Sequence, residues 1–108
     1  MEDISINKVE LQGRVGTVRI SPVAGTLVAN FSLMTEHHCG SRDGSPVCEV
    51  TWHNVAAFQG EDIRLDGLDR NAVVNVKGRL RQSRYTACDG TERIFTEIVA
   101  SSLTVIKN

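Results

Sequence analysis

Large aromatic side chains and small apolar ones alternate in the segment from residue 47 to residue 58. Successive side chains of a β-strand point to opposite faces, so Trp52 and Phe58 share one face and Val55 lies on the other. If the face with Val55 fills a core, the two aromatic rings project outward. Exposed rings can stack on nucleic-acid bases, which contributes about 1–3 kcal/mol per base and depends little on base identity.

Basic and apolar side chains alternate in the segment from residue 72 to residue 85, where Val74 and Val76 belong to the apolar face. The opposite face and the residues after it carry Asn75, Lys77, Arg79, Arg81, Arg84 and Tyr85. Arg14 and Arg19, in an earlier alternating segment, could join these cations. Clustered cations neutralise phosphates, so this face has the chemistry of a contact with a nucleic-acid backbone. Glu97, among apolar residues further along, could pair with a cation across a sheet.

The charge balance leaves two interpretations of these faces open. The chain has 12 lysines and arginines against 13 aspartates and glutamates, whereas nucleic-acid-binding domains usually carry a basic patch or a high pI. Net charge does not describe distribution, and the acids fall largely elsewhere, at Glu2, Asp3, Glu61, Asp62, Asp66 and Asp69. Solvent-facing cations and a buried tryptophan are nevertheless the commoner outcome in small domains, so periodicity alone does not decide.

Five segments with the alternation of strands must position these residues. The expected strands cover residues 6–20, 26–35, 47–58, 72–85 and 92–106. Residues 59–70, between the third and fourth strands, are expected to form a short helical connection, although Gly67 disfavours a helix. Three strands, a short helix and two further strands are the order of a five-stranded OB barrel. The sequence therefore predicts an all-β fold, with one OB-fold domain over residues 1–108.

Glycines and turn residues separate the expected strands. The apolar phase of the first strand shifts at Gly16, which predicts a bulge or a sharp bend. A turn is expected over residues 21–25, and an exposed loop over residues 37–46. Asp89-Gly90 predicts a hairpin between the last two strands. Long strands bent at glycines suit a small closed barrel, in which one strand must serve two sheets.

A metal centre or an active site would need ligands or a nucleophile–base pair at suitable spacing. His37, His38, Cys39 and Cys48 offer imidazole and thiol ligands for zinc, but their spacing matches no standard zinc module. We expect incidental thiols in a surface loop, and neither a metal nor a cofactor. His53 is expected to be a hydrogen-bonded core histidine and not a catalytic base, and we do not expect an enzyme.

The cysteine count and the hydropathy pattern bear on the compartment. Three cysteines without a CxxC spacing make a disulfide framework improbable and fit a reducing cytosol. No apolar run is long enough to span a bilayer. The acidic start, Met1-Glu2-Asp3-Ile4, lacks the features of a secretory signal. We therefore expect a cytoplasmic protein with no membrane partner.

Short segments along nearly the whole chain match one family in the same order. They are Asn7-Lys8-Val9 with Leu11, Gly13 and Gly16; Val28-Ala29-Asn30-Phe31-Ser32-Leu33; Thr51-Trp52-His53-Asn54-Val55 with Phe58; Val74-Asn75-Val76-Lys77-Gly78-Arg79-Leu80; and Arg84-Tyr85 with Asp89-Gly90, Arg93 and Glu97-Ile98-Val99. With these segments, spaced as in the family from Asn7 to about Ile106, the chain resembles the bacterial single-stranded DNA-binding proteins.

The resemblance implies an OB fold, usually assembled as a homotetramer, around which single-stranded DNA wraps. It implies that Trp52, Phe58 and Tyr85 stack on bases. It makes candidate phosphate contacts of Lys8, Arg14, Lys77, Arg79, Arg81 and Arg84. Many family members have a further stacking aromatic where this sequence reads Glu36-His37-His38-Cys39. Because histidine stacks less effectively than a larger aromatic ring, we expect a reduced affinity.

Two functional hypotheses follow. The leading one is sequence-tolerant binding of single-stranded DNA in replication, recombination or repair, without catalysis. The alternative is a primosomal-type OB-fold module, typically a dimer, that mainly binds other proteins and holds single strands weakly. The family normally continues into a flexible linker and an acidic tip that recruits repair and replication enzymes, whereas this sequence ends at Lys107-Asn108. Tail-dependent recruitment of enzymes is therefore not expected.

Overall fold

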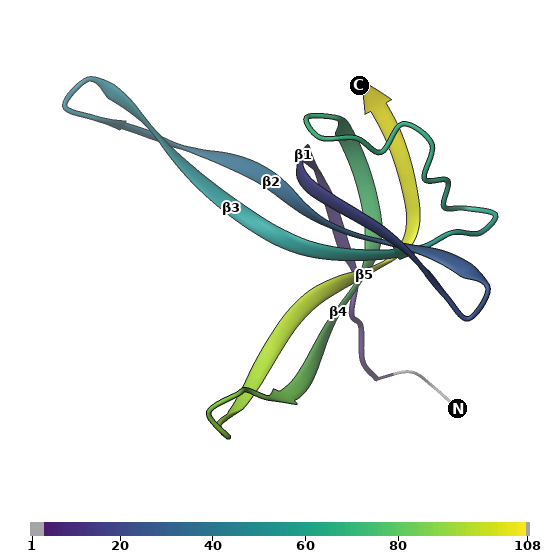
Figure 1. Ribbon diagram of the computed structural model, residues 1–108. Coiled ribbons are helices and arrows are strands. Elements are labelled where there is room, and N and C mark those ends of the chain that lie inside the picture. The colour runs from purple at the N-terminus through teal and green to yellow at the C-terminus, as the bar shows by residue number, and fades with distance from the viewer. Residues whose placement is uncertain (1–3, 108) are drawn as a thin grey trace.

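Five long strands form a closed barrel in the computed structural model, which describes residues 4–107 except the side chains of residues 39, 41, 42 and 45–47 (Figure 1). The strands are β1 (Val9–Val23), β2 (Thr26–Arg42), β3 (Ser45–Phe58), β4 (Val73–Thr86) and β5 (Glu92–Lys107). Their order around the barrel is β1-β2-β3-β5-β4, and β4 closes against β1. This is the arrangement of a five-stranded OB barrel, so the predicted fold class is confirmed.

Side-chain alternation fills the barrel as the sequence predicts. The largest fully buried side chains are Leu33, Val15, Val55, Val74 and Val76. Burying an aliphatic side chain of this size stabilises the fold by about 1.5–3 kcal/mol relative to leaving it exposed. The burial of Val55 fixes the inner face of β3, so Trp52 and Phe58 lie on its outer face, where both are exposed.

The first strand changes partner along its length. Residues Val9 to Arg14 pair with β4, and residues from Arg14 to Val23 pair with β2. The ladder with β2 shifts register between Val15 and Val18, which confirms the irregularity predicted at Gly16. Two other glycines permit close strand approach, because an added Cβ at Gly13 would overlap the Met34 carbonyl oxygen, and one at Gly78 would overlap that of Val99.

The third and fifth strands are parallel, whereas the other neighbouring strands are antiparallel. Among the described residues, the pairs Val55–Ile98 and Ala56–Val99 form this parallel ladder. The antiparallel ladders β2–β3 and β4–β5 are much longer. The seam between β3 and β5 is therefore the shortest ladder of the barrel.

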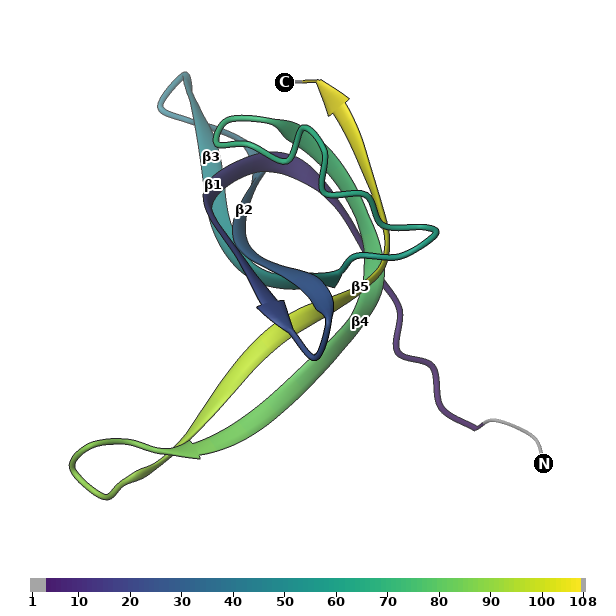
Figure 2. The same ribbon diagram turned by 45° about the vertical axis from the view of Figure 1, so that its right-hand side comes forward.

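Two hairpins, β2–β3 and β4–β5, project beyond the barrel in both views (Figures 1 and 2). The β4–β5 hairpin turns through residues 87–91, as predicted, with Gly90 at a positive φ of 87°. The β1–β2 turn is tighter than the expected segment of residues 21–25. Ser21 and Val23 still pair with β2. The turn itself consists of Ala24 and Gly25, which both have positive φ values.

The predicted exposed loop over residues 37–46 is wrong, because most of this segment belongs to the β2–β3 ladder. Asp43 and Gly44 form the turn with φ values of 54° and 80°, as a two-residue turn of type I′ requires. Gly40, at a φ of 94°, lies in a register shift between His38 and Ser41. A bulge followed by a tight turn has the same glycine-rich composition as a loop, which explains the error.

The predicted short helix between β3 and β4 is also wrong, since residues 4–107 contain no helical segment. Gly67 and Asn71 have φ values of 77° and 74°, which interrupt a right-handed helix. The segment is made of turns, and its apolar side chains Ile63 and Leu68 are buried in the core. Within the described residues, no helix is long and apolar enough to cross a membrane.

His53 lies half-buried on the inward phase of β3, with its Nε2 atom 2.9 Å from Thr35 Oγ1. This contact confirms the predicted hydrogen bond, but the predicted place in the core is wrong, because His53 is only half-buried and lies outside the core cluster. Partial burial lowers the pKa of His53 below its ordinary value of 6.5, because desolvation disfavours the imidazolium.

The close approach at Gly78 predicts a large cost for Gly78→Ala. The overlapping atom belongs to the backbone of β5 and cannot rotate away, so we expect a loss of about 1–3 kcal/mol in the free energy of unfolding. Gly60→Ala is the control, because the atom nearest to its added Cβ is 4.0 Å away. Urea denaturation measures both variants. Equal stability of the two variants would contradict the packing described for Gly78.

The lowered pKa of His53 predicts a pH dependence of stability. Below about pH 6.5, the unfolded chain binds a proton that the folded chain takes up only at lower pH. The free energy of unfolding therefore falls as pH falls through this window. Between about pH 7.5 and pH 5.5 we expect the thermal midpoint of the native protein to fall further than that of His53→Gln. Parallel decreases in the two proteins would show that His53 contributes nothing to this dependence.

Candidate nucleic-acid interface

Three aromatic side chains that the sequence singled out are exposed on outer strand faces. The exposed fractions are 57% for Trp52, 45% for Phe58 and 50% for Tyr85. Trp52 and Phe58 project from β3, and Tyr85 lies near the tip of the β4–β5 hairpin. Exposure of large apolar rings to water is unfavourable, so three exposed rings indicate a binding surface.

The ring of Trp52 lies across the outer face of β2 and reaches β1. Trp52 pairs with Met34 on β2, and a Cβ added at Gly16 on β1 would lie 2.6 Å from its Cζ3 atom. The same Cβ would lie 2.6 Å from Ser32 Oγ, which accepts a hydrogen bond from the Thr17 backbone N–H at 2.9 Å. The missing side chain of Gly16 therefore provides the space that the indole occupies.

A groove of about 340 Å³ lies beside Trp52, on the same outer surface. Asn54 comes from β3, two residues from Trp52, and Asn30 pairs with Arg19 in the β1–β2 ladder. Phe95 enters the groove from β5. Amide and guanidinium groups supply hydrogen-bond donors and acceptors for base edges and phosphates, and the phenyl ring supplies a stacking face.

The β4–β5 hairpin separates its side chains onto two faces. Arg81 opposes Glu97 and Tyr85 opposes Arg93, so these residues share a face with Phe95. Arg84 opposes Ile94 on the other face. Tyr85, Arg79 and Arg81 therefore lie on the hairpin face that carries the groove residues Phe95 and Glu97, and Arg84 lies on the opposite face.

Arg81 forms an ion pair with Glu97, a buried carboxylate at the groove. The Nε atom of Arg81 donates to Glu97 Oε1 at 3.1 Å, and its Nη2 atom donates to the same oxygen. The predicted pairing of Glu97 with a cross-strand cation is confirmed. A buried carboxylate needs such a partner, so Arg81 neutralises Glu97 as well as facing the groove.

The remaining predicted cations do not gather at the groove. Lys8 and Lys77 line a surface pocket between β1 and β4, together with Glu10. Arg14 donates from Nη1 to the Asn71 carbonyl oxygen at 2.7 Å, which ties β1 to the segment before β4. Arg79, between Lys77 and Arg81 on the same face of β4, links this pocket to the groove.

Phe95 was not predicted from the sequence, and Arg19 was predicted only as a possible addition to the cations. Phe95 is 39% exposed and follows Ile94, which is exposed on the opposite face. Because Ile94 and Phe95 are adjacent and both apolar, the sequence of β5 shows no alternation of polar and apolar residues here. The alternation pattern therefore could not show which of the two side chains points outward. The register with Tyr85 and Arg81 would have identified it, but register follows only from the folded pairing.

The chain matches the single-strand binding protein family over residues 6–106. It is 34% identical to the single-stranded DNA-binding protein of Neisseria meningitidis serogroup A over 107 residues, which cover 95% of this chain and 61% of that protein. The protein of the same name from Xanthomonas axonopodis pv. citri is 34% identical over 104 residues, with coverage of 94% and 58%. The chain thus spans about three fifths of the length of these relatives.

A solved structure described as Plasmodium falciparum SSB in complex with ssDNA has the same fold. The TM-score is 0.82 at 27% identity, over 99% of this chain and 100% of that one. The family match therefore extends over the barrel and both hairpins that carry the aromatic rings and the groove. On this basis, the chain belongs to the single-strand binding protein family.

Proposed function

We propose that this chain binds single-stranded DNA with little sequence preference and catalyses no reaction on it. The observation that carries the proposal is the exposure of Trp52, Phe58 and Tyr85 on outer strand faces, with a polar groove beside Trp52. Family membership supports it, as do the names of the relatives and the DNA in the related structure. Replication, recombination and repair are the processes in which we place this binding.

Stacking is the main source of affinity in this proposal. Trp52 presents an indole fixed against Gly16, and Phe95 presents a phenyl ring on the far side of the groove. Bases that stack on these rings leave their edges near Asn30 and Asn54, which can donate or accept hydrogen bonds with any base. Such a surface holds a strand without reading its sequence, over about 4–16 nucleotides per OB domain.

Cations guide the phosphates in this proposal. Lys77 and Arg79 lie outward along β4, and Lys8 adjoins Lys77. Arg14, Arg81 and Arg84 also remain candidate phosphate contacts, although each has different neighbours. Arg14 also holds a backbone carbonyl, Arg81 also holds Glu97, and Arg84 would meet only a strand that passes around the hairpin.

The primosomal alternative is not favoured, because the related proteins are named for binding single-stranded DNA. We propose further that the described residues act as one binding domain, that copies of the chain assemble as a homotetramer, and that the protein works in the cytoplasm. Family membership supports these three proposals. A dimer, measured by light scattering, would instead agree with the primosomal alternative.

Removal of the stacking rings should weaken binding of oligo(dT). Trp52→Ala, Phe58→Ala, Tyr85→Ala and Phe95→Ala should each lose about 1–3 kcal/mol, or roughly 5- to 150-fold in affinity. Ile94→Ala is the matched control, because Ile94 neighbours Phe95 but lies on the opposite face of β5. We expect its affinity to stay within about twofold of the native value. Fluorescence anisotropy at one fixed salt concentration measures all five variants, and unchanged binding by Trp52→Ala would refute the proposal.

Removal of outward cations should reduce the salt dependence of binding. For single strands, the slope of log affinity against log salt is about −0.7 per neutralised phosphate, so Lys77→Ala with Arg79→Ala should reduce its magnitude by about 1.4. Arg64→Ala is the control, because Arg64 shares its pocket with Glu61, Asp62 and Asp66. A slope that changes equally in both proteins would show that β4 makes no specific phosphate contact.

A further inference from the structure

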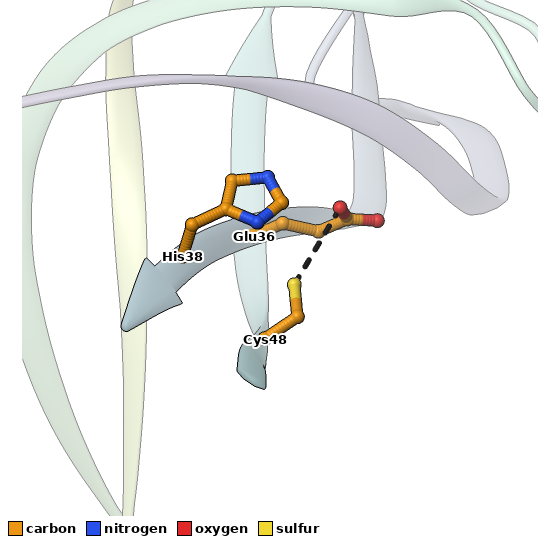
Figure 3. Close-up of side chains that lie close together, drawn as sticks. All are labelled: Glu36, His38 and Cys48. Atoms are coloured by element: carbon orange, nitrogen blue, oxygen red, sulfur yellow. Dashed lines mark hydrogen bonds between the residues drawn. The ribbon is translucent and has the colours of Figure 1, made fainter. Parts of the chain in front are cut away.

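Three side chains with different metal-binding atoms converge on one face of the β2–β3 hairpin (Figure 3). Glu36 and His38 are two residues apart on β2, so they share a face, and Cys48 on β3 pairs directly with His38. Their ligand atoms all lie within 4.8 Å of one another. All three side chains are exposed, and Cys48 Sγ donates to Glu36 Oε2 at 3.7 Å.

The donor set suits zinc. Zinc binds thiolate sulfur, imidazole nitrogen and carboxylate oxygen at about 2.0–2.3 Å, which places tetrahedral ligands roughly 3.5 Å from one another. The ligand atoms lie within 4.8 Å of one another, and all three side chains are exposed and therefore have room to rotate toward a common ion. The thiol proton of Cys48 would pass to solvent as the metal replaces it in the contact with Glu36.

Sequence spacing did not reveal this set. The segment suggested His37, His38, Cys39 and Cys48, but strand alternation places His37 on the opposite face, across from Glu49. Glu36, and not His37, lies beside His38 on the same face of β2. The ligand set therefore follows from the pairing of His38 with Cys48, which links positions ten residues apart.

We propose that Glu36, His38 and Cys48 bind one zinc-class divalent cation, with water as the fourth ligand. Three protein ligands and one open position are a known zinc arrangement. The bound ion connects β2 to β3 where the hairpin projects beyond the barrel (Figure 1). It therefore holds together a part of the ladder that the core does not cover. This proposal does not depend on the DNA-binding proposal.

Cobalt(II) titration of the full chain tests the site, because a thiolate ligand gives a charge-transfer band in the near ultraviolet. We expect the band to saturate at one cobalt per chain and to disappear when zinc is added. Cys48→Ser should abolish the band, and His38→Ala or Glu36→Ala should weaken cobalt binding by more than about tenfold. The controls His37→Gln, Cys39→Ser and Cys88→Ser should retain it.

Protection from alkylation gives a second readout within one sample. Cys48 and Cys88 are both exposed, at the two different hairpins. Zinc should slow the reaction of Cys48 with iodoacetamide and leave that of Cys88 unchanged, as peptide mass spectrometry would measure. Equal rates with and without zinc, or a cobalt band that persists in Cys48→Ser, would overturn the proposal. Circular dichroism of each variant confirms that it remains folded.

Discussion

Closure of the barrel requires β1 to pair with two neighbours, and much of the outer surface depends on this requirement. The first half of β1 follows β4 and the second half follows β2, with the change at Arg14. Glycine at position 13 lets the backbone of β2 pass closely, and the ladder then slips between Val15 and Val18. The space left at Gly16 is where the indole of Trp52 rests. A constraint on backbone pairing thus sets the position of a side chain proposed to stack on DNA.

Local pattern was enough to predict the fold class and the outward direction of the main aromatic rings. In β4, buried Val74 and Val76 alternate with Asn75 and Lys77, and this period-two burial gives the strand its inner face. The pattern failed where one composition fits two structures. Gly40 and Asp43-Gly44 fit a loop as well as a bulge and a turn, and only cross-strand pairing decides between them. The same holds for Phe95, whose outward direction depends on its register with β4.

Electrostatics at the groove are more balanced than the cations of β4 suggest. Glu97 is buried at the groove, and its pairing with Arg81 neutralises that cation, so Arg19 is the lining residue that carries the remaining charge. With a formal net charge of −1, the chain as a whole exerts no long-range attraction on a polyanion. In the proposed binding, the surface therefore relies on short-range contacts made by rings and amides. Sequence analysis anticipated a partner for Glu97, but the identity of that partner follows from the folded register.

The short ladder between β3 and β5 determines where the groove lies. The described pairs Val55–Ile98 and Ala56–Val99 join two hairpins that are each held by a much longer ladder of their own. Asn54 on β3 and Phe95 on β5 both line the groove, and each precedes the parallel pairs along its own strand. The groove therefore lies where β3 and β5 separate from their shared ladder.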